Sequence, residues 1–123
     1  MLELLHIENI AVIESADISF DGGFTVLTGE TGAGKSIVID SLSAVLGQRT
    51  SRDLIRTGAD KAYVSACFTG IPPEVGEDLG ITWDEELLLQ REIHADGKNV
   101  CRVGSRPVTV TQLRTLGSRL LNI

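Results

Sequence analysis

Cysteines and long apolar runs are scarce in this sequence of 123 residues, and both absences limit what the protein can be. The two cysteines, Cys67 and Cys101, lie far apart in no spacing typical of a metal site, so we expect buried thiols without a disulfide or catalytic role. No apolar run approaches the roughly 20 residues that cross a bilayer, and the N-terminus lacks the basic start of a signal peptide. These features predict a cytoplasmic domain with no membrane partner.

Basic residues are also scarce in the N-terminal part of the chain. Residues 1–48 contain a single basic residue, Lys35, and seven acidic ones, while residues 91–123 contain six basic and two acidic ones. The formal net charge of −6 argues against a domain coated in nucleic acid. The basic C-terminal third leaves two interpretations open, the solvated faces of a mixed domain or a local DNA-facing surface, since affinity for DNA depends on local Lys and Arg.

The apolar pattern predicts an α/β domain that opens with antiparallel strands. Strands are predicted over residues 2–10, 13–20, 24–28, 62–68, 86–94 and 99–103, with a turn at 21–23. A helix is predicted over residues 35–46, and it has so few polar residues that we expect it to be buried on most sides. Gly47 is suited to end this helix, because glycine accepts the left-handed conformation of a C-cap.

The C-terminal part predicts a hairpin and a second helix. Asp96 and Gly97 lie between two predicted strands, as in a tight hairpin whose two central residues both take positive φ. Either Thr109 or Thr111 can cap a helix that runs to about Arg119. Residues 120–123 are apolar enough to begin another strand, and because the sequence stops there, we expect the chain to be a fragment of a longer protein.

A phosphate-binding loop is the most specific motif in the chain. It matches the pattern G-x-x-x-x-G-K-S in full, with the residues Gly29, Glu30, Thr31, Gly32, Ala33, Gly34, Lys35 and Ser36. Its glycines let backbone N–H groups converge on a polyphosphate, and the following helix adds its positive dipole end. We expect the Lys35 ammonium to hold the β- and γ-phosphates of ATP as the catalytic cation, Ser36 to ligate Mg²⁺, and Ile37 to border the nucleotide.

The other parts of an ATPase are not visible in these residues. Hydrolysis needs a second carboxylate for Mg²⁺, which normally ends an apolar strand, and a group that orients the attacking water. The best apolar run, residues 87–89, is followed by Gln90 and Arg91, which suits a strand of a meander better. We therefore expect this chain to bind ATP and not to hydrolyse it alone.

The loop and its flanks resemble the RecN family of bacterial DNA repair ATPases. The resemblance covers essentially the whole chain and rests on the Gly-Glu-Thr form of the loop and on residues 4–13, 37–42, 46–49, 55–59, 102–108 and 112–117. It implies a P-loop NTPase fold, the ABC/SMC-like ATPase head, with an antiparallel β subdomain. Residues 1–123 would form its N-terminal part, and the coiled coil, the C-terminal half-head and the Gln, signature and Asp-Glu motifs would follow Ile123.

The resemblance also implies partners and a biological role. Two heads would sandwich ATP in an ATP-dependent dimer, and the full-length protein would act on DNA during recombinational repair of double-strand breaks, in association with the nucleoid. Arg52 and Arg56 would lie near nucleotide or DNA, although surface arginines bonded to loop carbonyls explain them equally well. Two alternatives stay open, the nucleotide-binding part of another ABC-type ATPase, or a nucleotide-gated structural module that does not need hydrolysis.

Four further residues suggest structure rather than chemistry. His6 and His94 have no Cys, Asp or Ser partner at a telling spacing, so we expect structural roles for both. Trp83 is interpreted as a packing anchor within an acidic segment. Asp40 is expected to bond the helix to a strand rather than to hold a metal.

Overall fold

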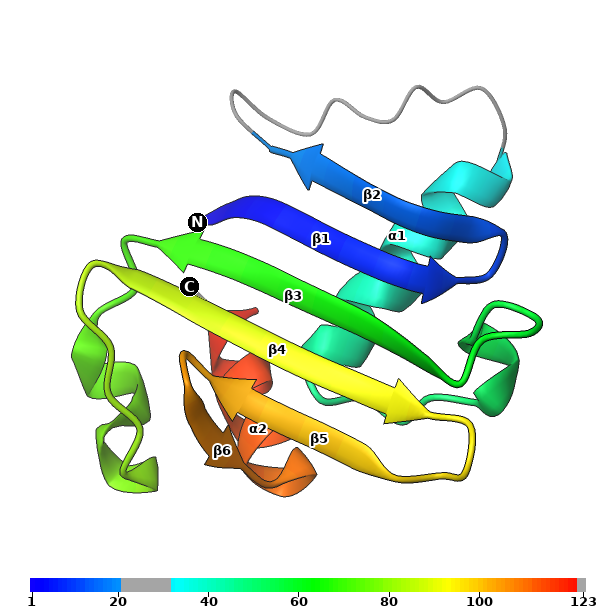
Figure 1. The fold of residues 1–123 in the computed structure, drawn as a ribbon. Coiled ribbons are helices and arrows are strands. Elements are labelled where there is room, and N and C mark those ends of the chain that lie inside the picture. Colours follow the sequence, from blue (N-terminus) through cyan, green and yellow to red (C-terminus); the bar gives the residue numbers. More distant parts are fainter. Residues whose placement is uncertain (21–31, 122–123) are drawn as a thin grey trace.

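The described part of the chain, residues 1–20 and 32–121, folds around one antiparallel sheet in this computed structural model (Figure 1). Its strands are β1 (Leu2–Ile10), β2 (Ile13–Ser19), β3 (Lys61–Thr69), β4 (Glu86–His94), β5 (Asn99–Val103) and β6 (Arg106–Val108). The helices are α1 (Gly32–Val45), η1 (Arg52–Leu54), η2 (Pro73–Leu79) and α2 (Val110–Leu120). The strand order is β2-β1-β3-β4-β5-β6. The predicted turn at 21–23 and strand at 24–28 lie outside the described residues.

The central strands alternate between the core and the open face of the sheet. In β3, Ala62, Val64, Ala66 and Phe68 are buried, while the residues between them are partly exposed. Both α1 and α2 pack on the same side of the sheet, which Figure 1 shows behind the strands. The core therefore forms between this side and the helices, as expected for an antiparallel sheet that is covered on one face.

The first helix ends where the sequence predicts. It begins at Gly32, three residues before the predicted start, and Gly47 follows its end with a φ of 90°. The N–H of Gln48 donates to the carbonyl of Ser43 at 3.1 Å, and that of Gly47 donates to Ala44 at 3.0 Å. These two bonds form a Schellman motif, which satisfies carbonyls that a helix end otherwise leaves free.

One side of α1 is not covered by the described residues. Val38, Ser41 and Val45 are buried, and the Ser41 hydroxyl donates to the carbonyl of Ile37 at 2.7 Å. Ile39, in contrast, is 60% exposed. The prediction of burial on most sides is thus wrong within this part of the structure, because a helix lying on a sheet buries only the face that contacts it. None of the described helices is long and apolar enough to span a bilayer.

The β4–β5 hairpin has the predicted position but a different turn. Gly97 takes a φ of 95°, whereas Asp96 does not have a positive φ. Instead, Asp96 Oδ1 accepts the N–H of Lys98 at 2.9 Å. The prediction that both residues take positive φ is therefore wrong, because the Asp96 side chain stabilises the turn and only the glycine needs the left-handed region.

The second helix has a complete N-terminal cap. Thr109 Oγ1 accepts the N–H of Gln112 at 3.0 Å, and Gln112 Oε1 accepts the N–H of Thr109 at 2.9 Å. This capping box decides between the two predicted caps in favour of Thr109 over Thr111. The helix includes Leu120, and Leu121 is its C-cap, so the strand predicted from residue 120 is wrong for these two residues. The rest of that predicted strand lies outside the described residues.

Candidate functional site

The predicted phosphate loop leads into the N-terminal end of α1. Residues 29–31 lie outside the described part of the chain, while residues 32–35 form the first turn of the helix. This turn contains no acidic residue, and the free N–H groups of a helix start favour an anion there. The side chain of Ser36 is exposed, so its hydroxyl is accessible, as a ligand to Mg²⁺ must be. The adjacent Ile37 is half-buried.

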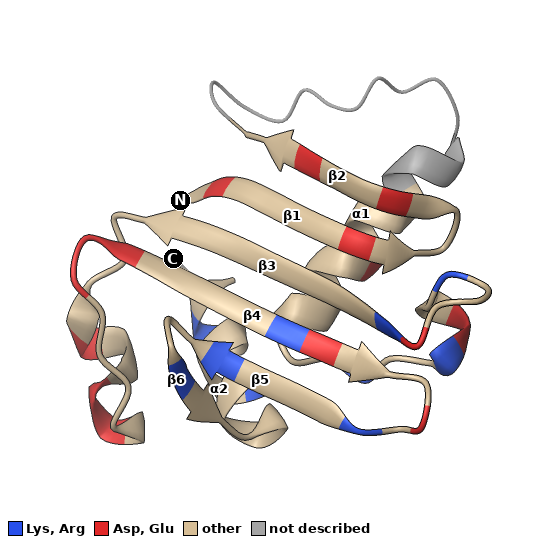
Figure 2. Ribbon diagram, viewed as in Figure 1, with Lys and Arg blue, Asp and Glu red and all other residues tan. Residues whose placement is uncertain are grey.

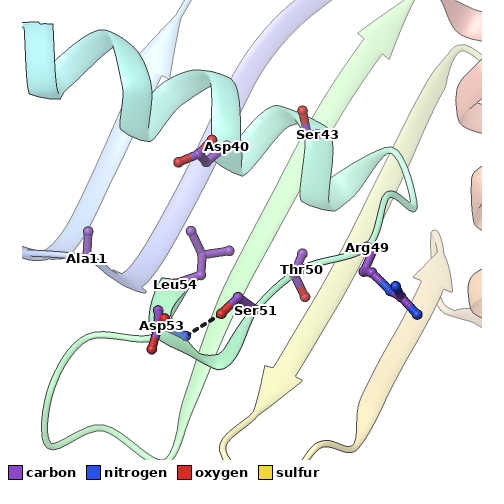
Figure 3. Close-up of a pocket in the computed structure, with 8 residues that line it drawn as sticks. All are labelled: Ala11, Asp40, Ser43, Arg49, Thr50, Ser51, Asp53 and Leu54. Carbon is purple, nitrogen blue, oxygen red and sulfur yellow. Dashed lines mark hydrogen bonds between the residues drawn. The ribbon is translucent and has the colours of Figure 1, made fainter.

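A cavity of about 400 Å³ lies beside α1 (Figure 3). It is lined by Ala11, Asp40, Ser43, Arg49, Thr50, Ser51, Asp53 and Leu54. Asp40 and Ser43 come from α1, Ala11 comes from the β1–β2 turn, and the others come from the segment after α1. The hydroxyl of Ser51 caps η1 by accepting the N–H of Asp53 at 3.1 Å. Six of the eight lining residues are polar or charged, and they combine hydroxyl groups with charges of both signs.

One wall of the cavity is built from unusual backbone. Asn9 and Ala11 have φ values of 55° and 53°, in the left-handed region that residues other than glycine rarely adopt. The N–H of Ala11 donates to the carbonyl of Leu54 at 2.8 Å, and the N–H of Arg56 donates to that of Asn9 at 2.8 Å. Such strain costs on the order of 1–3 kcal/mol per residue and persists only where neighbouring structure holds it. The β1–β2 turn is therefore fixed by the segment that follows α1.

The sequence suggests roles for three charged residues in or beside this cavity, Asp40, Arg52 and Arg56. Asp40 is exposed, and the predicted hydrogen bond from its side chain to a strand does not occur among the described residues. Arg52 is exposed in η1 and Arg56 is half-buried, and neither guanidinium bonds a described carbonyl. Their contact with nucleotide or DNA stays a prediction. Basic and acidic positions are interspersed around η1, as on a solvated surface of mixed sign (Figure 2).

His6 has two carboxylate partners that the sequence analysis missed. Its Nδ1 lies 2.6 Å from Asp17 Oδ1, and its Nε2 lies 2.6 Å from Glu8 Oε2. The hydrogen bond to Glu8 is the largest cause that raises the pKa of His6; burial opposes it, and the bond to Asp17 adds to it. The signal in the sequence was the spacing of two between His6 and Glu8, which puts both on one face of β1. The pairing with Asp17 depends on strand register.

Trp83 and His94, for which we expect structural roles, have hydrogen-bond partners in the structure. Among the described residues, no group of three or more His, Cys, Asp or Glu side chains is arranged to hold a metal ion. Trp83 anchors the segment before β4, since its Nε1 donates to the carbonyl of Ile71 at 3.1 Å. His94 bonds Glu92 at 3.0 Å.

Both cysteines are free thiols in the structure. Cys101 is buried and Cys67 is half-buried. Burial is the largest cause that raises the pKa of each thiol, which disfavours the reactive thiolate. The expectation of unreactive thiols agrees with this, although Cys67 is less buried than predicted.

Comparisons with known proteins agree with this geometry. The AAA domain family matches residues 4–100. The whole chain is 44% identical to the DNA repair protein RecN of Bacillus subtilis, but it spans only 22% of that protein. These findings confirm the resemblance to RecN that the phosphate loop and its flanks indicate.

Solved structures show the same fold. One comes from a study of ATP-driven dimerization and DNA-stimulated activation of SMC ATPases. That structure is 24% identical to this chain and superposes with a TM-score of 0.78, and the match covers 98% of this chain and 79% of that one. The Smc head domain with a coiled coil and joint from Pyrococcus yayanosii is 26% identical, with a TM-score of 0.76 over 96% of this chain and 25% of that one. The predicted α/β ATPase-head fold with an antiparallel sheet is therefore confirmed.

Proposed function

Because the chain belongs to the AAA domain family, we propose that it is the N-terminal, ATP-binding part of the head of a RecN-type DNA repair ATPase. The observation that carries this proposal is that α1 begins inside a complete phosphate-loop motif. The identity of 44% to a RecN protein supports the role in DNA repair. Since the chain spans 22% of that relative, hydrolysis and repair belong to the longer protein.

The phosphate loop supplies the binding chemistry in this proposal. Backbone N–H groups of residues 29–34 and the positive end of α1 bind the phosphate oxygens. The Lys35 ammonium holds the β- and γ-phosphates and stabilises the charge that develops during hydrolysis. The Ser36 hydroxyl is one ligand of Mg²⁺, and bound Mg²⁺ neutralises negative charge on the phosphates. Ile37 follows directly and borders the nucleotide from α1.

We place the nucleoside half of ATP in the cavity beside α1. Because an α-helix rises about 1.5 Å per residue, Asp40 and Ser43 lie roughly 6 Å and 10 Å along the axis from Ser36. That is about the distance from the terminal phosphate of ATP to its sugar and base. The hydroxyls of Ser43, Thr50 and Ser51 suit a ribose, and a cavity of about 400 Å³ is within the size range of small-ligand sites.

The proposed partners, a second head and DNA, are inferred from similar proteins. The SMC study names ATP-driven dimerization and DNA-stimulated activation of those proteins. We propose that ATP likewise joins this head to a second one, and that the full-length protein acts on DNA at double-strand breaks, in the cytoplasm and on the nucleoid. Arg52 and Arg56 are candidates for contacts with nucleotide or DNA, because both lie in the segment that lines or flanks the cavity.

Survival of DNA breakage tests the proposed function. Cells that lack the full-length protein are supplied with the wild type, with Lys35→Ala, or with Lys61→Ala, and are exposed to an agent that breaks both DNA strands. Lys61 is the matched control, because it is an exposed lysine whose ion pair with Glu92 spans 3.7 Å and contributes little. We expect rescue by the wild type and the control, and no rescue by Lys35→Ala. Rescue by Lys35→Ala would contradict the proposal.

A further inference from the structure

Arg91 is a buried cation at the end of α1 opposite the phosphate loop. It lies on the inward face of β4 and is only 3% exposed. Its Nη1 donates to the carbonyls of Ala44 at 2.7 Å and Gln48 at 2.6 Å. Its Nε donates to Oδ1 of Asn99 at 3.0 Å. The guanidinium of one strand residue thus joins the last turn of α1 to the start of β5.

The partners of Arg91 are unusual for a buried charge. Buried cations normally pair with a carboxylate, because removing a charge from water is costly. Arg91 has no salt bridge to any residue in the described ranges, and burial is the largest cause that lowers the pKa of its guanidinium. Two main-chain carbonyls and the negative end of the α1 dipole take the place of the carboxylate. The charge is therefore placed where it bonds the end of this particular helix.

A second arginine contacts the same helix end. The Nε of Arg114, from α2, donates to the carbonyl of Gly47 at 3.1 Å. Gly117, one turn further along α2, packs against the carbonyl of Leu46. The C-terminal end of α1 is consequently held from two directions, by the sheet through Arg91 and by α2 through Arg114.

We infer that Arg91 is a positioning residue for the nucleotide, an inference that rests on the proposed function. The 14 residues of α1 form a rod of about 21 Å, with the phosphate loop at one end and the Arg91 contacts at the other. Because the helix is stiff and contacts β1, β3 and β4, release of one end lets the rod tilt and displaces the other end. A displacement of about 1 Å at reacting groups can cost roughly 10²-fold in activity.

Asn99 has a secondary part in this arrangement. It accepts the Nε proton of Arg91 and so orients the plane of the guanidinium toward the two helix carbonyls. It also donates to the carbonyl of Gly97 at 3.3 Å, which ties the bond to the hairpin turn. The hairpin between β4 and β5 thereby helps to fix the helix that carries the phosphate loop.

The test compares arginine variants in the full-length protein. Arg91→Met removes the donors but keeps an apolar side chain, Arg91→Lys keeps the charge but loses the planar fork, and Asn99→Ala removes only the orienting acceptor. Arg119→Met is the matched control, since Arg119 bonds Asp78 at 2.6 Å and the carbonyl of Val75 at 2.8 Å, away from α1. For each variant, the Kd for ATP is measured by calorimetry well below the melting temperature, which is measured separately.

We expect Arg91→Met to raise the Kd for ATP about tenfold, and Arg91→Lys and Asn99→Ala to raise it by smaller factors in the same direction. Arg119→Met should lower the melting temperature without changing the Kd. An unchanged Kd in the Arg91 variants, or Kd changes in Arg119→Met that match those in Arg91→Met, would overturn the inference. If Arg91→Met does not fold, Arg91→Lys and Asn99→Ala decide by the same comparison.

Lys35→Ala, measured alongside, separates this inference from the proposed function. If Lys35→Ala no longer binds ATP and the Arg91 variants bind ATP with wild-type affinity, only the positioning role fails. If Lys35→Ala binds ATP as tightly as the wild type, the proposed function fails, whatever the Arg91 variants do.

Discussion

Gly117 of α2 packs directly on the main-chain carbonyl of Leu46, where α1 ends, and leaves no room for a side chain. A Cβ atom at this position would collide with the carbonyl oxygen, which is backbone and cannot move aside easily. Gly117→Ala should therefore destabilise the chain by about 1–3 kcal/mol, as overpacking does in other cores. The free energy of unfolding in urea measures this. Ser118→Ala, on the exposed neighbour, should change it by less than about 0.5 kcal/mol. Equal losses of unfolding free energy in Gly117→Ala and Ser118→Ala would contradict the close packing of α2 on the end of α1.

The capping box of α2 predicts a difference between two nearby threonines. Thr109→Ala removes the acceptor for the N–H of Gln112 and should cost about 1 kcal/mol of stability. Thr111→Ala removes an exposed side chain inside the first turn and should have little effect, because alanine favours helices. Thermal unfolding of the two variants checks this order. A larger loss for Thr111→Ala would contradict the assigned cap.

His6 predicts a pH dependence of stability with a definite sign. Folding raises the pKa of His6, chiefly through Glu8, so its ion pairs stabilise the folded chain fully below the ordinary pKa of 6.5. This contribution is lost as the pH rises through the raised value. Unfolding in urea, compared between wild type and His6→Gln from about pH 5.5 to about pH 8.5, should show the largest deficit of the variant at the acidic end.

A second variant identifies the cause of this pH dependence. Glu8→Gln removes the charged partner of Nε2 and should make the stability of the protein less dependent on pH over the same range. A deficit of His6→Gln that grows toward alkaline pH would contradict the assignment.

The cavity beside α1 predicts that nucleoside and phosphate binding can be separated. Ser43→Leu fills part of the cavity with an apolar side chain. Because this side chain occupies space that the nucleoside needs, it should raise the Kd for ATP about tenfold. Binding of inorganic tripolyphosphate, which has no nucleoside, should not change. Ser43→Ala is the control that leaves the space open. Equal weakening of ATP and tripolyphosphate would place the nucleoside elsewhere.

Local patterns predicted most of the strands because the signal needed is in the strand itself. The alternation in residues 62–68 and 86–94 predicts β3 and β4 nearly to their ends, since every second residue must face the core. Similarly, Gly47 predicts the end of α1, because a left-handed residue is needed there. The phosphate loop is predicted from the residue types and spacing of its motif, and the resemblance of its flanks to RecN agrees with the relatives.

Contacts between distant segments could not be predicted in the same way. The pairing of His6 with Asp17 depends on the register of β1 and β2, and Arg91 finds the carbonyls of Ala44 and Gln48 only once α1 lies on the sheet. The exposure of Ile39 depends on what covers the second side of α1, which the composition of the helix does not specify. Non-local packing, rather than local propensity, decides all three.

Calorimetric titration of ATP with Mg²⁺ into the full-length protein tests the central claim most directly. The wild type and Lys61→Ala should bind ATP with the same affinity, because Lys61 is an exposed residue of β3 that is not part of the phosphate-loop motif. Lys35→Ala should show no measurable binding, since the loop then lacks the cation that holds the β- and γ-phosphates. Binding of ATP by Lys35→Ala with wild-type affinity would contradict the assignment of residues 29–36 as the nucleotide site.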